Sequence, residues 1–294
     1  MAMPLLKEQL ALFTVPPDTP KVKQPANGYT FTYGNCQVGI KQEDCVQFLQ
    51  SLPDQSVDII VTDPAYAGMN NHLQLGRGRI VGTYEHKGSE NGKWFAEFKD
   101  SEENYRIFLS ECRRVLSKRT GHIYIMFDSF SLLTLGALVR DYFDIKNLIT
   151  WDKINIGMGH YFRRRHEYVI FATNGNNRKI RNRTIPDIWR FKRIYRAQYV
   201  TQKPVELFQA MIFASAEDGF TVCDPFMGSG SSAIAAIKNN CNFIGCDISE
   251  KATDLSRKRI EHQLATGQDC LQPKPSHVPN EEIFWEFPAR VVVS

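Results

Sequence analysis

One short apolar run constrains the fold of this chain more than any other stretch. Residues 57–62 have the sequence VDIIVT, in which β-branched side chains fill most positions. Such a run is typical of a parallel strand that is buried on both faces, because strands of this kind lack polar alternation. Asp63, Pro64, Ala65 and Tyr66 follow directly. Ligands of open α/β sheets bind beyond the carboxyl ends of strands, so we expect this tetrad to face a cleft.

The tetrad has the chemistry to hold an amino group. Pro64 fixes its own backbone and biases Asp63 toward an extended conformation, so the Asp63 carboxylate and the Pro64 carbonyl offer two acceptors that are held apart. Tyr66 offers a flat face on which a heteroaromatic base can stack, an interaction of about 1–3 kcal/mol. An ordinary Asp-Pro turn after a strand has the same sequence, so the tetrad alone does not decide between function and structure.

The composition is that of an ordinary globular chain. Its 294 residues are 43% hydrophobic, which suffices for a core in one large α/β domain or two smaller ones. No stretch approaches the ~18 apolar residues of a membrane span and the start lacks a signal-peptide core, so we expect a cytoplasmic protein without a membrane partner. The seven cysteines are scattered without C-x-x-C pairs, which favours reduced core thiols over a metal site or a disulfide framework.

Strands and helices are expected to alternate along the chain. The apolar pattern predicts strands within 29–40, 57–62, 121–128, 145–151, 167–173, 220–223 and 242–246. It predicts helices at 42–52, 104–116, 132–142, 205–216 and 233–237. This alternation predicts a doubly wound α/β sheet in a central domain of residues 29–266. The flanking stretches 1–28 and 267–294 are expected to be an N-terminal and a C-terminal arm.

Two stretches interrupt this alternation. Residues 67–103 have no regular pattern, and so long a segment after a cleft motif is expected to be a substrate loop or lid. Residues 174–199 are strongly basic, with Trp189, Phe191 and Tyr195 interleaved, which is typical of a segment that contacts phosphates and faces bases. A solvated basic surface stays open as the alternative. The candidate DNA-contacting residues are Arg163, Arg178, Lys179, Arg181, Arg183, Arg190, Lys192 and Arg193.

The second half of the chain predicts a nucleoside site. The strand at 220–223 runs into the loop DPFMGSG at 224–230, and the next strand ends at Asp247. A glycine-rich loop after one strand and an acid after the next are the plan by which α/β sheets bind a ribose, whose hydroxyls the acid accepts. The loop lacks the G-x-G-x-x-G fingerprint of dinucleotide sites, and Asp224 would repel a diphosphate. A cationic or amino-bearing ligand suits it better.

Three motifs together resemble the S-adenosylmethionine-dependent DNA amino-methyltransferases, in the group whose catalytic tetrad precedes the cofactor loop. They are DPAY at 63–66, TQKP at 201–204 and DPFMGSG at 224–230. The resemblance covers about residues 29–262. It implies one Rossmann-like catalytic domain with a mixed seven-stranded sheet, helices on both faces and a circularly permuted motif order. It also implies S-adenosylmethionine as cofactor, duplex DNA as partner and residues 174–199 as a short target-recognition segment.

The resemblance implies roles for single residues as well. Asp63 and the Pro64 carbonyl would hold the target amine, and Tyr66 would stack on a flipped base. The cofactor would be surrounded by Asp224, Phe226, Gly228 and Gly230, with Lys203 near its carboxylate, Asp247 at the ribose hydroxyls and Asp44 at the adenine amine. From the residues alone, Asp44 would suit equally an N-cap of the helix at 42–52.

The identity of the target base follows from the resemblance too. In this family an acid at the first tetrad position goes mostly with adenine and a serine mostly with cytosine, so Asp63 implies adenine N6. Cytosine N4, an RNA or protein substrate, and a non-catalytic relative remain alternatives. Ala65, where the family usually has a second proline, is the one hint of a non-catalytic relative. A homodimer and a partner restriction endonuclease also stay open.

Overall fold

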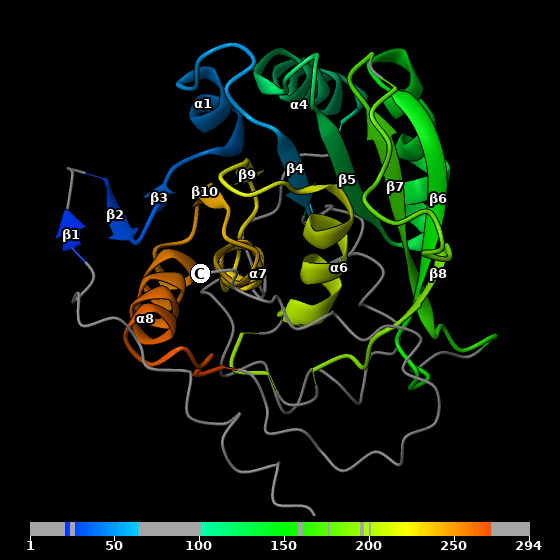
Figure 1. The fold of residues 1–294 in the computed structure, drawn as a ribbon. Coiled ribbons are helices and arrows are strands. Elements are labelled where there is room, and N and C mark those ends of the chain that lie inside the picture. The colour runs from blue at the N-terminus through cyan, green and yellow to red at the C-terminus, as the bar shows by residue number, and fades with distance from the viewer. Residues whose placement is uncertain are drawn as a thin grey trace, which may run out of the picture.

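One mixed sheet organises the computed structural model, which describes residues 21–23, 27–64, 101–157, 161–175, 177–194, 197–199 and 201–271. Seven strands cross its centre in the order β3 (Cys36–Gln42), β10 (Asn242–Asp247), β9 (Thr221–Asp224), β4 (Ile59–Thr62), β5 (His122–Phe127), β7 (His166–Thr173) and β6 (Asp144–Asp152) (Figure 1). Neighbours from β3 to β5 run parallel, whereas β7 runs antiparallel to β5 and β6. The predicted mixed seven-stranded sheet is confirmed.

Three short strands extend the two edges of this sheet. β2 (Gly28–Tyr33) forms an antiparallel hairpin with β3 around Gly34, whose φ of 54° suits glycine. β1 (Lys21–Lys23) pairs with β2, so part of the expected N-terminal arm joins the sheet. β8 (Ile188–Arg190) pairs in parallel with β6 at the opposite edge. The rest of both arms, up to residue 20 and from residue 272, lies outside the described residues.

Helices cover both faces of the sheet, as predicted (Figure 1). One face carries α1 (Cys45–Gln50), α4 (Glu102–Val115), α5 (Ser129–Leu135) and the 3-10 helix η1 (Gly136–Asp141). The other carries α6 (Val205–Ser215), α7 (Ser231–Lys238) and α8 (Glu250–Thr266). The sequence pattern missed α8 because its buried side includes polar residues such as Thr253, Ser256 and Gln263. No helix of the described ranges combines the length and apolarity that a membrane crossing requires.

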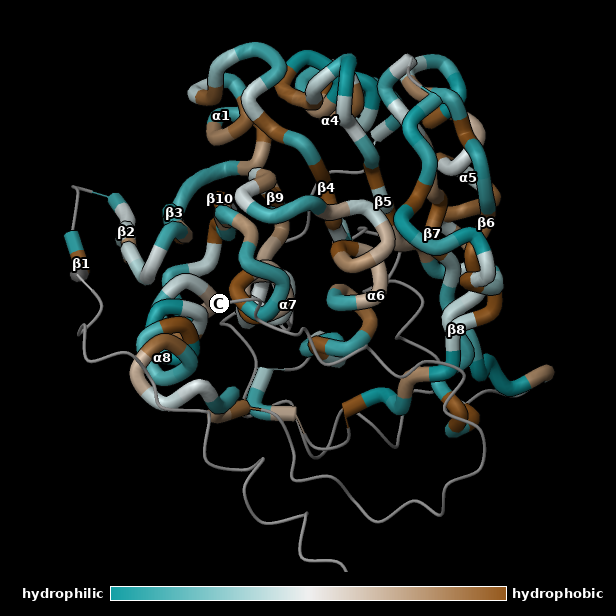
Figure 2. Tube along the Cα trace, viewed as in Figure 1, coloured by the Kyte–Doolittle hydropathy of each residue, from teal (hydrophilic) through white to brown (hydrophobic). Residues whose placement is uncertain are grey.

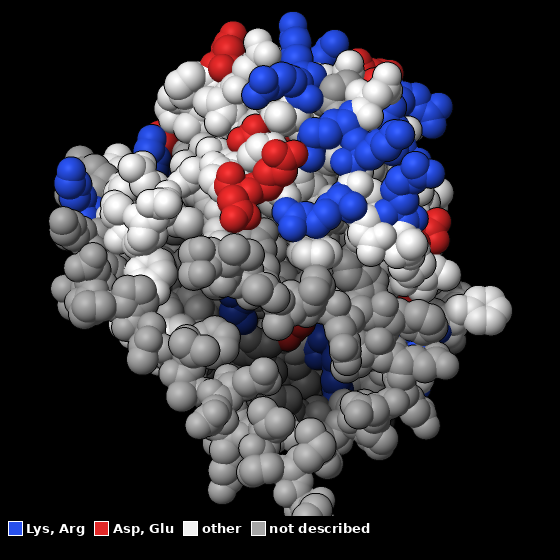
Figure 3. Space-filling model, viewed as in Figure 1, with Lys and Arg blue, Asp and Glu red and all other residues white. Residues whose placement is uncertain are grey.

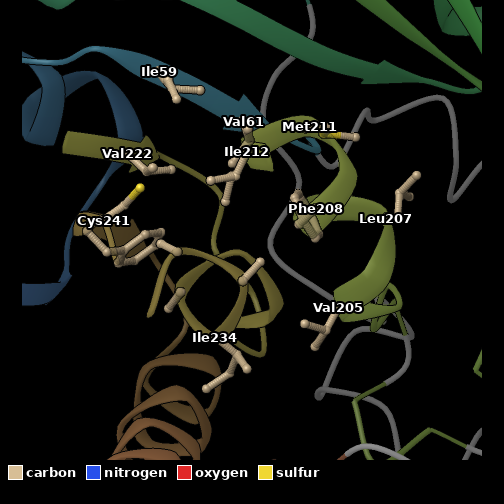
Figure 4. Close-up of a cluster of buried hydrophobic side chains, with 14 of the residues drawn as sticks. Ile59, Val61, Val205, Leu207, Phe208, Met211, Ile212, Val222, Ile234 and Cys241 are labelled. Atoms are coloured by element: carbon tan, nitrogen blue, oxygen red, sulfur yellow. The ribbon is translucent and has the colours of Figure 1, made fainter. Parts of the chain in front are cut away.

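Apolar burial between α6, α7 and the sheet fixes the two central strands. Val61 of β4 and Val222 of β9 are fully buried against Phe208 and Ile212 of α6 and against α7 (Figure 4). Each such side chain stabilises the fold by roughly 1.5–3 kcal/mol relative to an exposed one. Hydropathy mapped on the chain shows the central strands β4 and β5 as predominantly apolar, whereas β2 near the edge of the sheet is mostly hydrophilic (Figure 2). β4 and β9 therefore lie side by side although they are far apart in sequence.

The register of the parallel strands brings three carboxylates to one edge of the sheet. β4 pairs with β9, and β9 pairs with β10, all in parallel. Asp63 follows β4, Asp224 ends β9 and Asp247 ends β10. The carboxyl ends of these strands therefore form one edge, the carboxyl edge, and the motifs predicted to bind substrate and cofactor meet there.

All seven cysteines are described, and all are free thiols. Five of them are buried, as expected for core thiols. Within the described ranges there is no cluster of three or more His, Cys, Asp or Glu side chains that could hold a metal ion.

Candidate active site

A cavity opens at the carboxyl edge, between β4, β9, β10 and the start of α6. Together with its open mouth it encloses about 850 Å³ of space. Of the predicted site residues, it is lined by Asp44, Asp63, Lys203, Phe226, Gly228 and Asp247. The structure therefore brings together residues from both ends of the catalytic segment. Pro64 is buried beside Asp63, and Tyr66 lies outside the described residues.

A line of alternating charges runs from the tetrad to the far strands. The Lys203 ammonium donates a hydrogen bond to Asp63 Oδ2, and it also lies 3.6 Å from Glu167 Oε2. Glu167, on β7, accepts a hydrogen bond of 3.0 Å from Lys153 through its Oε1 atom. The resemblance implied that Lys203 lies near the cofactor carboxylate. In the structure Lys203 lines the cavity and its ammonium is paired with Asp63.

The members of this line shift one another's pKa values. Burial raises the pKa of Asp63, and the Lys203 ammonium counteracts part of that rise. Burial disfavours the Lys203 ammonium, yet Asp63 and Glu167 together raise the pKa of Lys203 above its usual value. Burial also opposes ionisation of Glu167, but Lys203 and Lys153 hold its pKa below the usual range. The neighbours therefore stabilise the charges of Lys203 and Glu167, whereas Lys203 offsets only part of the rise in the pKa of Asp63.

The glycine-rich loop after β9 needs glycine at two positions. Gly228 has φ of 50° and Gly230 has φ of 77°, the left-handed region that side chains disfavour. A Cβ at Gly230 would lie 2.9 Å from Ser256 Oγ, and one at Gly228 would lie 3.5 Å from the Tyr199 ring. The loop therefore packs closely on α8 and presents bare backbone to the cavity at Gly228.

Asp224 supports this loop from behind. Only 1% of it is exposed, and its carboxylate accepts hydrogen bonds from the Phe226 N–H at 3.0 Å and the Ser232 hydroxyl at 2.6 Å. Burial raises the pKa of Asp224 to about 7. It is absent from the described lining of the cavity. Its contacts favour a role in holding the loop over the direct cofactor contact that the resemblance implied.

Asp247 and Asp44 reach the cavity from two different elements. Asp247 accepts from the Gly228 N–H at 3.0 Å and from the Ser249 N–H at 2.9 Å, which joins the loops after β9 and β10. Burial raises the pKa of Asp247. Asp44 caps α1 through Oδ1, which accepts from the Val46 and Gln47 N–H groups. The capping role that the sequence left open for Asp44 is therefore present, together with its place in the cavity.

Several lining residues carried no recognisable signal in the sequence. They include Tyr199, Phe208 and Ile248, whereas Thr201 and Gln202, which also line the cavity, belong to the TQKP motif. Ile248 is 54% exposed although it is apolar, and it follows Asp247 directly. An apolar side chain beside an acid suits the flat base and the hydroxyls of a nucleoside. Tyr199 could not be predicted because it lies far from Gly228 in the sequence. It is the last residue of the basic segment, yet its ring lies next to the loop at Gly228.

Another unpredicted residue, Arg259 of α8, holds the glycine-rich loop in place. Its fully buried guanidinium donates to the Ser229 carbonyl at 2.9 Å and to the Ser231 hydroxyl at 3.0 Å. The same group forms two hydrogen bonds with Asp269, of 2.7 and 2.6 Å. A buried arginine is tolerated only with such complete pairing. Arg259 thus ties the cofactor loop to the end of α8.

The family described as DNA methylase, N6_N4_Mtase, matches residues 57–258, well over half of the chain. The chain belongs to this N6/N4 DNA methylase family. S-adenosylmethionine is therefore the methyl donor, and DNA is the substrate class. The matched residues span the tetrad, Glu167, Lys203, the glycine-rich loop and most of α8.

Individual relatives of the methylase agree with this assignment. Type II methyltransferase M2.DpnII of Streptococcus pneumoniae is 27% identical over 258 residues, covering 80% of this chain and 93% of the relative. M.HhaII of Haemophilus parahaemolyticus is 29% identical over 213 residues, covering 69% of this chain and 87% of the relative. The crystal structure of the M1.HpyAVI–SAM complex has a TM-score of 0.53 at 19% identity, covering 76% of this chain and 99% of that chain. These likenesses confirm the predicted Rossmann-like methyltransferase fold.

The basic residues of the methylase fall into two groups at opposite edges of the sheet. Arg178 donates to the Thr120 carbonyl at 2.8 Å and to the Ser215 carbonyl at 2.8 Å. Thr120 precedes β5 and Ser215 ends α6, so this group lies at the amino edge. Arg181 is also engaged there, at the Ala216 carbonyl. In Figure 3, Lys and Arg side chains gather over the part of the molecule where Figure 1 shows β5, β6 and β7.

This placement disagrees with the DNA contacts expected for Arg178, Lys179, Arg181 and Arg183. They lie away from the cavity, and Arg178 is half-buried with a role in packing. Trp189, expected to face bases, is only 2% exposed and donates to the Pro186 carbonyl. Sequence composition indicates the charge of a segment and not the edge of the sheet on which it lies.

The second group remains on the substrate side. β8 runs parallel to β6, so Arg190, Lys192 and Arg193 lie at or beyond its carboxyl end. Arg163 precedes β7, whose antiparallel direction puts its first residues at the same edge. Arg163 and Lys192 are both exposed. These residues are the better candidates for contact with DNA phosphates.

Removal of Arg259 is expected to destabilise the methylase strongly. Arg259→Met leaves the Asp269 carboxylate buried without its partner, so we expect the free energy of unfolding to fall by about 3–5 kcal/mol. Urea unfolding measures this loss. Arg257→Met on the same helix, where the ion pair with Glu261 is more exposed, is the control and should cost below about 1 kcal/mol. Equal losses for the two variants would contradict the fastening role of Arg259.

The two basic groups are expected to differ in their contribution to DNA binding. Each phosphate contact adds about 0.9 to the slope of log affinity against log salt. Neutralising Arg163 and Lys192 to Gln should therefore flatten the slope by roughly one to two. The matched pair Lys179→Gln and Arg183→Gln should leave it unchanged. Fluorescence polarisation with a duplex oligonucleotide at several salt concentrations tests this, and the reverse ranking would reject the assignment to edges.

Proposed function

We propose that this DNA methylase transfers a methyl group to the N6 atom of adenine in duplex DNA. One observation carries the proposal: the Asp63 carboxylate opens on the cavity while its Oδ2 atom is held by Lys203. Among the described residues, Oδ1 of the same carboxylate has no hydrogen-bond donor, so it can accept a hydrogen bond from a target amine. The Pro64 carbonyl, next in the chain, supplies the second acceptor.

These two acceptors address the main chemical difficulty of the reaction. An exocyclic amine is a poor nucleophile because its lone pair is delocalised into the ring. Hydrogen bonds from the amine to Asp63 and Pro64 favour a more tetrahedral nitrogen with a localised lone pair, oriented toward the methyl group. S-adenosylmethionine supplies that methyl group on a sulfonium, which makes it electrophilic. When bound, the cofactor would supply the methyl group from its sulfonium and leave as a neutral thioether, and the proton released from the amine nitrogen would pass to the Asp63 carboxylate that is hydrogen-bonded to it.

The chain's own residues fit a nucleoside-bearing methyl donor. Ile248 and Phe226 offer apolar surface for its base, and Asp247 can accept from its ribose hydroxyls. Asp44 uses Oδ1 for capping, and within the described residues its Oδ2 accepts no hydrogen bond, so Oδ2 can serve the exocyclic amine of the donor. The glycine at position 228 allows close approach of the ligand to the backbone. These roles remain proposals that binding measurements on the variants below address.

A base inside a duplex cannot reach this cavity, so the target must leave the stack. Extrusion costs a few kcal/mol in lost pairing and stacking. In the proposed complex, Tyr66 stacks on the extruded base and recovers part of this cost.

Adenine is favoured over cytosine by the charge at the first tetrad position. A carboxylate accepts a charge-assisted hydrogen bond, stronger than a hydroxyl would accept, and the resemblance associates an acid here with adenine. Cytosine N4 is the alternative. The PvuII methyltransferase, described as cytosine-N4-specific, has a TM-score of 0.56 to this structure at 13% identity, with 79% of this chain and 93% of that chain covered. The fold is therefore compatible with either base.

The relatives' names extend the proposal to partners. M2.DpnII and M.HhaII are named type II methyltransferases, which supports a partner restriction endonuclease for this chain. A homodimer and a cytoplasmic location stay predictions.

Product analysis is expected to identify adenine as the target. Genomic DNA incubated with the enzyme and S-adenosylmethionine, then digested to nucleosides, should yield N6-methyladenine by mass spectrometry. N4-methylcytosine as the main product, with no N6-methyladenine, would reject adenine as the target base. It would leave the assignment to the DNA methylase family unchanged. Modified-base sequencing of the same DNA gives the recognition sequence.

Substitution of two acids is expected to separate methyl transfer from cofactor binding. Asp63→Ala should abolish methyl transfer and leave S-adenosylmethionine affinity nearly unchanged, because Asp63 serves the substrate amine. Asp247→Ala should weaken cofactor affinity first, because Asp247 lies at the cofactor side of the cavity. Isothermal titration calorimetry on both folded variants tests the assignment. Loss of cofactor binding in Asp63→Ala would count against it.

The pH dependence of methyl transfer is expected to report the charge line. Asp63 must be ionised to accept from the amine, so its pKa sets the acid limb of kcat. Lys203→Met removes the cation that lowers the Asp63 pKa, so the limb should move to higher pH. Glu167→Gln removes an anion that raises this pKa, so the limb should move to lower pH. Shifts in the same direction for both variants would exclude Asp63 as the titrating group.

A further inference from the structure

The connection between β6 and β7 presents two neighbouring aromatic side chains to solvent. Tyr161 is 93% exposed and Phe162 is 100% exposed. Apolar side chains that stay in water forgo the stabilisation of burial, and a contiguous exposed apolar surface marks an interaction site. The aromatic pair is therefore held away from the core.

The stem below this pair is built by the chain itself. The Lys153 N–H donates to the Arg165 carbonyl at 2.8 Å, and the Gly157 N–H donates to the Arg164 carbonyl at 2.7 Å. Arg163 Nε donates back to the Gly157 carbonyl at 2.7 Å. These bonds join the two sides of the connection directly below Tyr161 and Phe162. The projection of the aromatic pair is thus supported by backbone pairing.

Positive charge surrounds the base of the stem. Arg163, Arg164 and Arg165 follow the aromatic pair directly. Arg165 forms two hydrogen bonds of 2.6 Å with Asp152, which also lies 3.6 Å from Arg190. The Arg163 side chain is exposed beside the tip. Aromatic faces next to arginines suit a polyanion that offers flat rings, which is the chemistry of a nucleic acid.

The aromatic pair stands on the edge of the sheet that carries the cavity. Asp152 at the end of β6 pairs with His166 at the start of β7, and Tyr168 pairs with Phe127 at the end of β5. Asp63 follows β4, which is parallel to β5 with Thr62 opposite Ile125. The stem and the catalytic acid therefore belong to the same carboxyl edge, on which a duplex must lie to deliver its base.

We propose that Tyr161 and Phe162 form a stacking wedge that enters the duplex where the target base leaves it. An extruded base leaves a gap in the stack, and an aromatic side chain in the gap recovers stacking energy. The neighbouring arginines hold the phosphates on either side. The inference rests on the proposed function only in taking duplex DNA as the partner, and it holds for adenine and cytosine targets alike.

Binding to a duplex with a preformed gap tests the wedge. We use two 30-base-pair duplexes of the same sequence, one intact and one with a single abasic site. The wild-type enzyme should prefer the abasic duplex, and the double variant Tyr161→Ala, Phe162→Ala should reduce that preference by roughly 5- to 150-fold, the value of stacking one base. Phe162→Trp should keep it. The salt slope should not change, because the wedge contacts no phosphate.

Controls separate the wedge from other roles of the same residues. Ile107→Ala, at an exposed apolar position on α4 with 44% exposure, should leave the preference unchanged. An undiminished preference in the double variant overturns the proposal. So does a change from dimer to monomer in sedimentation, which would assign the aromatic pair to a contact between two copies. Neither result depends on which base is methylated, and product analysis reports that separately.

Discussion

The Lys203 ammonium, held between two carboxylates, is the interaction on which the catalytic edge depends. A buried charge is tolerated only when partners replace the water that it has lost. Asp63 and Glu167 provide that replacement, and they come from β4 and β7. Lys203 itself directly precedes α6 through Pro204. One cation thus joins two strands and a helix, and any shift of these elements would leave a charge unpaired.

The side of the cavity that is proposed to bind the cofactor is held by a separate set of contacts. Asp224 fixes the start of the glycine-rich loop, Arg259 holds its end from α8, and Asp247 joins it to the loop after β10. Each contact involves loop backbone or a loop hydroxyl, so the loop conformation does not depend on a ligand. A preorganised loop lowers the ordering cost of binding. Substrate and cofactor halves are therefore positioned independently, on neighbouring strands of one sheet.

Local patterns in the sequence predicted the elements, because apolar runs and turn residues act over short distances. The strands around residues 57–62 and 242–246 and the helix at 205–216 follow from such runs. The pairing of Lys203 with Asp63 could not be predicted from such local patterns. The two residues lie 140 positions apart in the sequence, and only the fold brings them together. The helix α8 was hidden by its buried polar side, which serves Arg259. The density of positive charge at 174–199 indicated a basic surface. Only the direction of the strands shows which of these residues lie at the amino edge of the sheet and which at its carboxyl edge.

Strand direction also explains how a permuted chain order forms a single site. The tetrad precedes the cofactor loop by about half the chain, yet β4 and β9 are parallel neighbours, so their carboxyl ends coincide. Parallel neighbours must be joined by a crossover connection. Along the chain, the segment between β4 and β9 contains β5, β6, β7 and β8, which form the half of the sheet on the other side of β4 from β9. Those strands carry Glu167 into the site and the stem of Tyr161 and Phe162 to its border. The chain segment that separates the tetrad from the cofactor loop therefore also forms the surface on which DNA is proposed to lie.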